Sequence, residues 1–207
     1  MALGKKKITK RDMDALETKN KLFNVSLQLF AKYGYDKVTI DDITQYAGVS
    51  KGNFYTHFDS KDAVLVEQFR EIDDYYTAAF KQVTPDMGTE DKIMLLVRSM
   101  CEYCEDICGL DVIKIVYMNQ IGLGQRVKIL LNQQRAFYNI IRDIVHKGHI
   151  QGYFTMKMTE DEIVEFLARA CRNHLYEWCL YDGAMNLKES GKTFFECILR
   201  CLRADPR

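Results

Sequence analysis

The sequence has only two prolines in 207 residues and no apolar run long enough to cross a bilayer. Because proline interrupts helices, this scarcity lets long helices run unbroken. A membrane-spanning helix needs roughly 20 consecutive, mainly apolar residues. The basic start of the chain has no apolar run behind it, as a secretory signal would. We therefore expect neither a membrane span nor a secretory signal.

Net charge is also lacking, with 29 basic and 29 acidic residues. An excess of Lys and Arg over the first sixty or so residues is balanced by an acidic remainder, which suits a polyanion-binding region but is also within ordinary scatter. The seven cysteines are an odd number without a secretory signal, which favours reduced thiols over a disulfide framework. We therefore expect a cytoplasmic protein.

Motifs for catalysis are missing as well. The sequence has no nucleophile elbow, no phosphate-cradling loop and no HExxH zinc motif. Gly122 and Gly124 lack the preceding strand that a dinucleotide-binding fold requires. We expect a protein that is not an enzyme and that holds no cofactor.

Apolar residues recur every three or four positions along the chain, which predicts an all-α fold of about nine helices. Gly34 and Gly48 suit helix ends, and Thr39, Ser50 and Ser60 suit helix starts. The first helix is expected to end at Gly34. The later helices are expected near residues 40–47, 51–58, 61–83, 89–107, 110–120, 124–147, 159–181 and 188–203.

Residues 39–58 are the most informative segment, because a tight turn joins two short predicted helices there. A helix-turn-helix presents its second helix to the DNA major groove, which is wide enough to admit it. Phe54 and Phe58 lie four residues apart and suit the buried face. Glycine inside a helix lowers helix stability by about 1 kcal/mol relative to alanine. A close approach of the backbone to DNA would explain why Gly52 stands there. The exposed faces then carry side chains that can donate to phosphates or read base edges: Lys51, Asn53, Tyr55, Thr56 and His57.

Four runs carry a more specific resemblance: Leu29–Tyr35, Val38–Ile43, Ala47–Phe58 and Ser60–Asp62. With their spacing, they resemble the DNA-binding domain of the TetR family of transcriptional regulators over about residues 16–66. Thr44 stands where that family usually has alanine. Together with the exposed face, the resemblance implies DNA contacts from Thr39, Ser50, Lys51, Gly52, Asn53, Tyr55, Thr56, His57 and Lys61.

Two of these positions have particular expectations. Asn53 stands where the family commonly has a small hydroxyl residue or alanine, so it is expected to alter the preferred operator. Lys61 begins the next helix, where its amine and the helix N-terminus would bind one phosphate together.

Three domains are expected: a flexible N-terminal arm over residues 1–15, the helix-turn-helix domain over 16–66, and a helical effector-binding and dimerisation domain over 67–207. The lysines at positions 5–7 and Arg11 are expected to be disordered, with transient DNA contact. In the third domain the resemblance extends to architecture only, and it implies a ligand cavity among the middle helices.

The middle helices are rich in aromatic residues, Met and Cys, which suits a mostly apolar cavity but is also ordinary core material. The residues assigned to the cavity are Met100, Cys104, Ile107, Tyr117, Met118, Phe137, Ile141 and Trp178. Apolar stripes on the last two helices suit pairing with a second copy, although both stripes must also fill the core of one chain. The residues assigned to this homodimer seam are Phe166, Ala170, His174, Phe194 and Ile198.

The predicted function is a ligand-responsive regulator, most simply a repressor. It would bind a palindromic operator in double-stranded DNA as a homodimer and be released by a small, mostly apolar organic effector. One alternative is a thiol or metal sensor working through Cys101, Cys104 and Cys108, which share a helical face, although zinc would need a fourth ligand and no metal site is assigned. Another alternative is a constitutive DNA binder without an effector.

Overall fold

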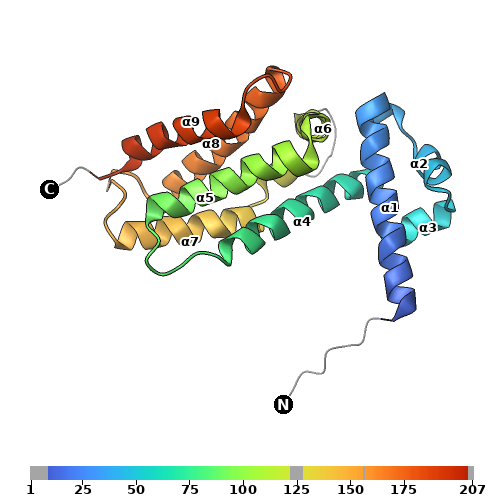
Figure 1. Cartoon of the computed structure of the whole chain (residues 1–207), viewed down its shortest axis with the longest axis horizontal. Coiled ribbons are helices and arrows are strands. Elements are labelled where there is room, and N and C mark those ends of the chain that lie inside the picture. The colour runs from blue at the N-terminus through green and yellow to red at the C-terminus, as the bar shows by residue number, and fades with distance from the viewer. Residues whose placement is uncertain (1–8, 122–127, 156, 205–207) are drawn as a thin grey trace, which may run out of the picture. The chain divides into compact units, whose positions relative to one another are not determined.

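The computed structural model describes residues 9–121, 128–155 and 157–204, and these ranges form nine α-helices and no strand (Figure 1). The predicted all-α class is therefore confirmed. None of the described helices combines the length and the apolar run that a bilayer crossing needs. The lysines at positions 5–7 and the junction at Gly122 and Gly124 lie outside the described residues.

The chain divides into two compact units between Val66 and Glu67. The first unit begins with α1, whose N-cap is Thr9: its hydroxyl accepts from the Asp12 amide, and the Asp12 carboxylate accepts from the Thr9 amide. Because α1 already starts at Lys10, the expected flexible arm over residues 1–15 needs correction, and Arg11 lies in a helix. The helices of this unit are α1 (Lys10–Tyr33), α2 (Ile40–Ala47), α3 (Lys51–His57) and the start of α4 (Lys61–Phe80).

Local chemistry fixes the ends of the two short helices. Thr39 and Asp42 form the same reciprocal cap at the start of α2. Gly48 ends α2 in the left-handed conformation, with φ of 64°, which glycine adopts without a Cβ clash. The Ser50 hydroxyl then accepts from the Asn53 amide at 3.2 Å and starts α3. The helices pack on a core with fully buried members Leu22, Phe30, Ile43, Ala47 and Phe54.

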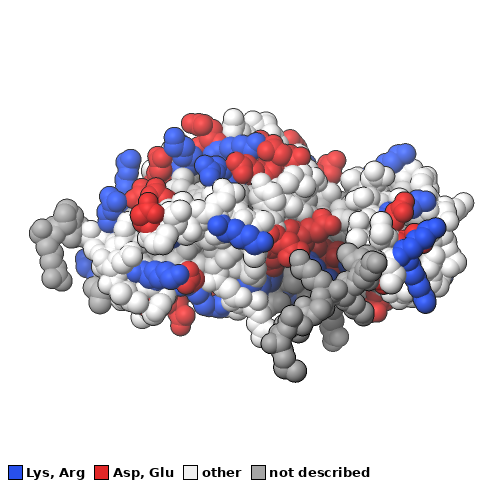
Figure 2. Space-filling view, turned by 60° about the horizontal axis from the view of Figure 1, so that its bottom comes forward, with Lys and Arg blue, Asp and Glu red and all other residues white. Residues whose placement is uncertain are grey.

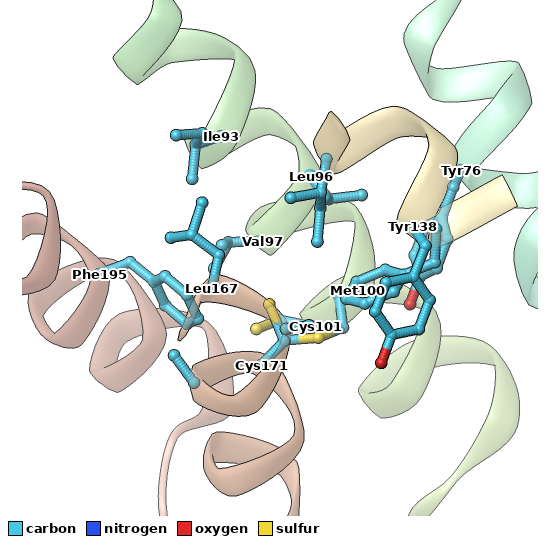
Figure 3. Packing of buried hydrophobic residues seen from close by; sticks show 14 of the residues in the cluster. Tyr76, Ile93, Leu96, Val97, Met100, Cys101, Tyr138, Leu167, Cys171 and Phe195 are labelled. Carbon is cyan, nitrogen blue, oxygen red and sulfur yellow. The ribbon is translucent and has the colours of Figure 1, made fainter. Parts of the chain in front are cut away.

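The second unit contains the rest of α4 and five further helices, in which α5 packs beside both α7 and α9 (Figure 1). Figure 3 shows the centre of this unit, where Leu167 and Phe195 meet the apolar side of α5. The further helices are α5 (Thr89–Glu102), α6 (Leu110–Ile121), α7 (Ala136–Ile150), α8 (Glu160–Leu180) and α9 (Leu187–Leu202). Two irregular pieces accompany them, a π-helical turn over Tyr103–Cys108 and a 3-10 turn over Ile129–Leu131.

The helix predicted over 124–147 begins later, at Ala136. Its N-cap, Arg135, makes no capping hydrogen bond with its side chain, so the sequence carries no start signal there. The Arg135 guanidinium instead forms two hydrogen bonds, of 2.9 and 3.0 Å, with the Asp73 carboxylate on α4. A tertiary contact therefore fixes this position, and local propensity does not reveal it.

Charges of both signs are mixed on the second unit. On the face that Figure 2 shows, Lys and Arg side chains of this unit lie among Asp and Glu side chains. One example is Lys188, which contacts both Glu105 and Asp106, at 3.3 and 2.8 Å. Such a mixed surface does not favour binding to a polyanion through the second unit.

Candidate DNA-binding helix and internal cavity

The short helix α3 has one buried and one exposed side. Phe54 is 0% exposed and Phe58 is 3% exposed, and their ring centroids lie 5.7 Å apart. On the other side Tyr55 is 49% exposed, although its ring still packs edge-on against Phe54. The buried rings therefore hold a helix whose remaining predicted contact residues reach the surface: Lys51, Gly52, Asn53 and Thr56, with His57 partly exposed.

Helix α2 accommodates the unusual residue at position 44. Thr44 is buried, and its hydroxyl donates to the Asp41 carbonyl at 3.1 Å. Its own carbonyl accepts from the Val49 amide at 3.0 Å. A threonine is therefore tolerated at a position where the TetR resemblance leads one to expect alanine.

Lys51 is paired within the unit. Its ammonium lies 2.9 Å from the Asp41 carboxylate, and this hydrogen bond is the main reason that the pKa of Lys51 is raised. Both side chains are exposed, and exposed ion pairs contribute only about 0 to 1 kcal/mol. The pair can therefore open, and Lys51 is available to a phosphate or a base edge.

Three hydroxyl residues of the predicted set are exposed; Thr39 and Ser50 cap helices, and Thr56 makes a hydrogen bond within α3. Thr39 donates to the Asp42 carboxylate at 2.6 Å, and Thr56 donates to the Gly52 carbonyl at 3.0 Å. Ser50 accepts from an amide, which leaves its own proton to donate. Ser50 is thus better prepared than Thr39 or Thr56 to donate to a phosphate.

Lys61 requires a correction. Its ammonium donates to the carbonyls of Tyr35 and Val38, at 2.6 and 2.8 Å, and lies 4.2 Å from the centroid of the Tyr35 ring. The Tyr35 hydroxyl in turn donates to Asp62 at 2.6 Å. Since an ammonium has three donors, Lys61 uses most of its capacity to hold the segment before α2 against the start of α4. We therefore reassign Lys61 from a phosphate contact to a positioning residue.

The second unit contains a cavity of about 60 Å³ that is lined by residues of α4, α5, α6, α7, α8, the π-helical turn and the 3-10 turn. Four predicted residues line it: Met100, Cys104, Tyr117 and Phe137. Sequence reasoning did not name further apolar members of the wall, such as Phe69, Ile72 and Val116. It also missed the polar members Gln68, Arg135 and Arg172.

The other four residues assigned to the cavity lie elsewhere. Ile107 is 59% exposed and Met118 is 71% exposed, whereas Ile141 and Trp178 are buried in other parts of the core. The π-helical turn explains Ile107, because its wider hydrogen-bonding pattern shifts the following side chains off the regular helical faces. Met118 lies on the solvent side of a helix that is apolar almost all round, so periodicity cannot assign its direction.

Two polar groups in the wall are firmly held. The Arg135 and Asp73 side chains are 8% and 16% exposed, and the guanidinium lies 4.6 Å from the centroid of the Phe69 ring. Gln68 donates to the Tyr103 hydroxyl at 2.7 Å, and burial raises the pKa of Tyr103. The cavity is therefore mainly apolar, with a few fixed polar groups, as small-molecule sites usually are.

The cysteine cluster behaves as core material. Burial raises the pKa of Cys101 and of Cys108 to about 12, and it also raises the pKa of Cys104 well above its ordinary value. These thiols stay protonated near neutral pH, whereas metal binding and thiol oxidation need the thiolate. Within the described ranges, no three His, Cys, Asp or Glu side chains are grouped to hold a metal ion. The arrangement does not support the thiol or metal sensor.

Only part of the predicted dimer seam is exposed. Phe166 and Phe194 lie at the surface, but Ala170, His174 and Ile198 are buried within the chain's own second unit. His174 shows why, because its ring stacks on Phe194 and its Nε2 lies 3.0 Å from the Leu187 carbonyl. The buried three therefore need correction as seam residues, since they pack α8 against α9 within one chain.

Comparison with known proteins adds independent findings. Residues 22–67 match the family described as bacterial regulatory proteins, tetR family. An uncharacterized HTH-type transcriptional regulator of Bacillus subtilis, YerO, is 46% identical over 50 residues, which are 24% of this chain and 17% of that protein. The HTH-type transcriptional repressor KstR2 of Mycobacterium tuberculosis is 20% identical over 182 residues, covering 87% of this chain and 90% of that protein.

One solved structure extends the likeness to the whole architecture. The transcriptional regulator FadR of Bacillus subtilis, in complex with stearoyl-CoA, has a TM-score of 0.76 and 14% identity to this chain. The match covers 87% of this chain and 97% of that chain. At this identity, the likeness shows a shared fold.

Proposed function

Because the chain belongs to the TetR family of bacterial regulatory proteins, we propose that it is a transcriptional repressor that binds a palindromic operator as a homodimer. A small organic effector in the second unit releases it from DNA. The observation that carries the DNA-binding part is the polar, exposed side of α3, which two buried phenylalanine rings hold in place. A helix of this kind fits the major groove.

The residues of α3 have different roles in this proposal. Lys51 and Asn53 read base edges, and Tyr55 packs against a sugar-phosphate. Packing within the protein does not require a glycine at position 52, because a Cβ there would meet nothing closer than the Ser50 Oγ at 3.8 Å. In this proposal, Gly52 instead lets the backbone of α3 approach DNA closely. The remaining phosphate contacts come from Thr39, Ser50, Thr56 and His57.

The dimer is supported by apolar side chains that the last two helices leave exposed. Phe166, Leu180 and Phe194 are exposed on α8 and α9 of a single chain. Two-fold pairing through these helices would bury them and give two copies of α3. The copies must lie roughly 34–36 Å apart, one DNA turn, to enter successive major grooves.

The release mechanism depends on α4. This continuous helix starts at Lys61 in the first unit and carries Phe69, Ile72 and Tyr76 into the wall of the cavity. An effector that displaces those side chains would shift α4 and change the spacing between the two copies of α3. DNA and effector would then favour different states, each lowering affinity for the other.

Selection of bound sequences from random duplex DNA tests the DNA-binding part. We expect a palindrome whose half-sites are about one turn apart, and weaker binding by Lys51→Gln and Tyr55→Ala variants. The Lys147→Gln variant is the matched control, because it removes one exposed charge from α7. Failure to bind any duplex at low ionic strength would refute the proposal, and recovery of single half-sites would refute the dimer.

A constitutive DNA binder is the second candidate, and the size of the cavity favours it. Small-molecule sites usually measure roughly 300–1,000 Å³, whereas this cavity measures about 60 Å³. An effector must therefore be small or must widen the cavity. Under the second candidate, the second unit only dimerises and no small molecule changes DNA affinity.

A further inference from the structure

The internal cavity has a neighbour on the surface. A groove of about 450 Å³ is formed by residues of α6, the 3-10 turn at Ile129–Leu131 and α8. Tyr117, Leu130 and Arg172 line both this groove and the cavity of about 60 Å³. The cavity and the groove are therefore separated only by these three shared residues, which we call the shared wall. A small movement of their side chains would let one bound molecule occupy both spaces.

The inner cavity suits a small apolar group. Its wall is built mainly from side chains such as Phe69, Ile72 and Val116, and no carboxylate lines it among the described residues. An engineered apolar cavity of roughly 150 Å³ holds one benzene ring. The present cavity, of about 60 Å³, therefore holds a short alkyl group as it stands, holds an aromatic ring once the shared wall moves, and does not hold a long chain.

The outer groove suits a negative charge. Lys128, Arg169 and Arg172 all line it, and no Asp or Glu is among its described lining residues. Glu165 is a nearby carboxylate that forms ion pairs with Arg169 at 3.9 Å and Arg172 at 4.0 Å, so it offsets one of the three positive charges. The groove therefore keeps an excess of positive charge.

Arg172 connects the two environments. Its side chain is 19% exposed, and its Nη1 donates to the Tyr138 hydroxyl at 2.5 Å, which fixes the guanidinium. The backbone carbonyl of the same residue accepts from the Tyr117 hydroxyl at 2.5 Å. A half-buried, fixed guanidinium can bind a carboxylate by short charge-assisted hydrogen bonds.

We propose that the cavity and the groove form one site for a compact organic anion, a carboxylate carrying an aromatic ring or a short alkyl chain. The apolar part occupies the inner cavity, and the carboxylate binds Arg172 at the shared wall. Lys128 and Arg169 attract the anion from the groove. This inference rests on the proposed effector-binding function and names the chemical class of the effector.

The test measures binding to the full-length protein without DNA. Calorimetric titrations use benzoate and hexanoate as the anions, benzyl alcohol and hexanol as their neutral counterparts, and palmitate as the long-chain anion. We expect each short anion to bind tighter than its alcohol by on the order of tenfold or more, as a hydrogen bond to a charged group allows. Equal affinity for alcohols and anions, or a preference for palmitate, would overturn the proposal.

Variants locate the charge that is responsible. Arg172→Met should abolish the preference for the anion over the alcohol, and Arg172→Lys should restore part of it. The Arg169→Gln variant, exposed and easily tolerated, should weaken anion binding severalfold even if Arg172→Met fails to fold. Lys147→Gln, outside both hollows, should bind as the parent does. Unchanged anion binding in Arg169→Gln, and in Arg172→Met where that variant folds, would place the carboxylate elsewhere and refute the site.

The binding experiment distinguishes failure of the anion site from failure of DNA binding. If neither anion binds while the protein still selects a DNA palindrome, this inference fails and the DNA-binding regulator stands. If the anions bind through Arg172 but no duplex is bound, the site stands and the regulator fails. Benzoate or hexanoate that binds without changing operator affinity would support the site and refute its role as the effector site.

Discussion

Each of the two units contains an ion pair, and the two pairs differ in how far they are exposed to solvent. In the first unit the Lys51–Asp41 pair is open to solvent, and such a pair is easily exchanged for a contact with DNA. In the second unit the Arg135–Asp73 pair is nearly buried, and its partners cannot be separated without leaving a charge uncompensated. The two pairs therefore differ in what they can do: Lys51 can exchange its carboxylate partner for another anion, whereas Arg135 is a fixed part of the cavity wall.

The largest expected effect is a loss of stability when a buried aromatic residue is truncated in either unit. Phe54 and Phe195 are both fully buried, one in each unit. Truncation of either to alanine should lower the free energy of unfolding by about 3–5 kcal/mol, because it removes contacts and leaves a cavity. Urea unfolding measures this loss.

The two variants should differ in DNA binding. With Phe54→Ala, the exposed side of α3 loses the ring that positions it, so affinity should fall even where the chain is still folded. With Phe195→Ala, α3 and the residues around it are unchanged, so any loss of DNA affinity should follow weakening of the proposed dimer. Equal DNA affinity in Phe54→Ala and the parent, under conditions where both are folded, would contradict the assignment of α3.

The sequence predicts the first unit better than the second, and the reason is physical. Around α2 and α3 every boundary has a local signal, such as the Thr39 cap, Gly48 with positive φ and the Ser50 cap. A local signal is readable in sequence because its partners lie three or four residues away. The α7 start at Ala136 depends instead on an ion pair between Arg135 and Asp73, which no local pattern reveals.

The site residues follow the same division. The exposed side of α3 could be predicted because Phe54 and Phe58 fix which way the helix faces. The role of Lys61 could not, because the carbonyls that it binds, at Tyr35 and Val38, come from a distant segment. In the second unit, a regular period places Ile107 inward, but the π-helical turn over Tyr103–Cys108 moves it to the surface.

A second prediction compares two lysines of the first unit. Lys61→Met should destabilise the protein by about 1.5–3 kcal/mol, because two carbonyls lose hydrogen bonds to a charged donor. Lys51→Met should change stability little, since its pair with Asp41 is exposed. Thermal unfolding measures both effects.

The salt dependence of operator binding then separates the roles of the two lysines. Loss of one cation from the DNA interface lowers the slope of log affinity against log salt concentration by about 1, because fewer counterions leave the DNA on binding. We expect this change for Lys51→Met and none for folded Lys61→Met. A reduced slope in the Lys61 variant would restore that lysine as a phosphate contact.

A third prediction compares two glycines inside helices, one in each unit. A Cβ at Gly148 would lie 2.6 Å from Phe154 Cε2 and 2.7 Å from Thr89 Cγ2, so Gly148→Ala should cost about 1–3 kcal/mol through overpacking. At Gly52 the nearest atom would be 3.8 Å away, so Gly52→Ala should stabilise the protein by about 0.5–1 kcal/mol. Urea midpoints measure both changes.

Gly52 is informative because its expected changes in stability and function have opposite signs. If the backbone of α3 approaches DNA closely, the alanine methyl group should weaken operator binding while the protein becomes more stable. Gly148→Ala should weaken DNA binding only as far as it unfolds the chain. Gly52→Ala that is both more stable and equally tight on DNA would show that glycine is not needed for the approach.

The smallest expected effect should be alike in both units, since each has the same reciprocal cap. The hydrogen bond from the Thr39 side chain, followed by that from its backbone, lowers the pKa of Asp42, and the backbone and side chain of Thr159 likewise lower the pKa of Glu162. A carboxyl whose pKa is lower in the folded state stabilises the protein above its unfolded pKa. That contribution is lost as the pH falls through about 4 and below.

Thr39→Ala and Thr159→Ala should therefore each make the free energy of unfolding less dependent on pH in this acid range, as measured by urea midpoints between about pH 3 and 6. Because both caps are exposed, the two changes should be similarly small, and a large change in one alone would show that its carboxylate has a further role in that unit.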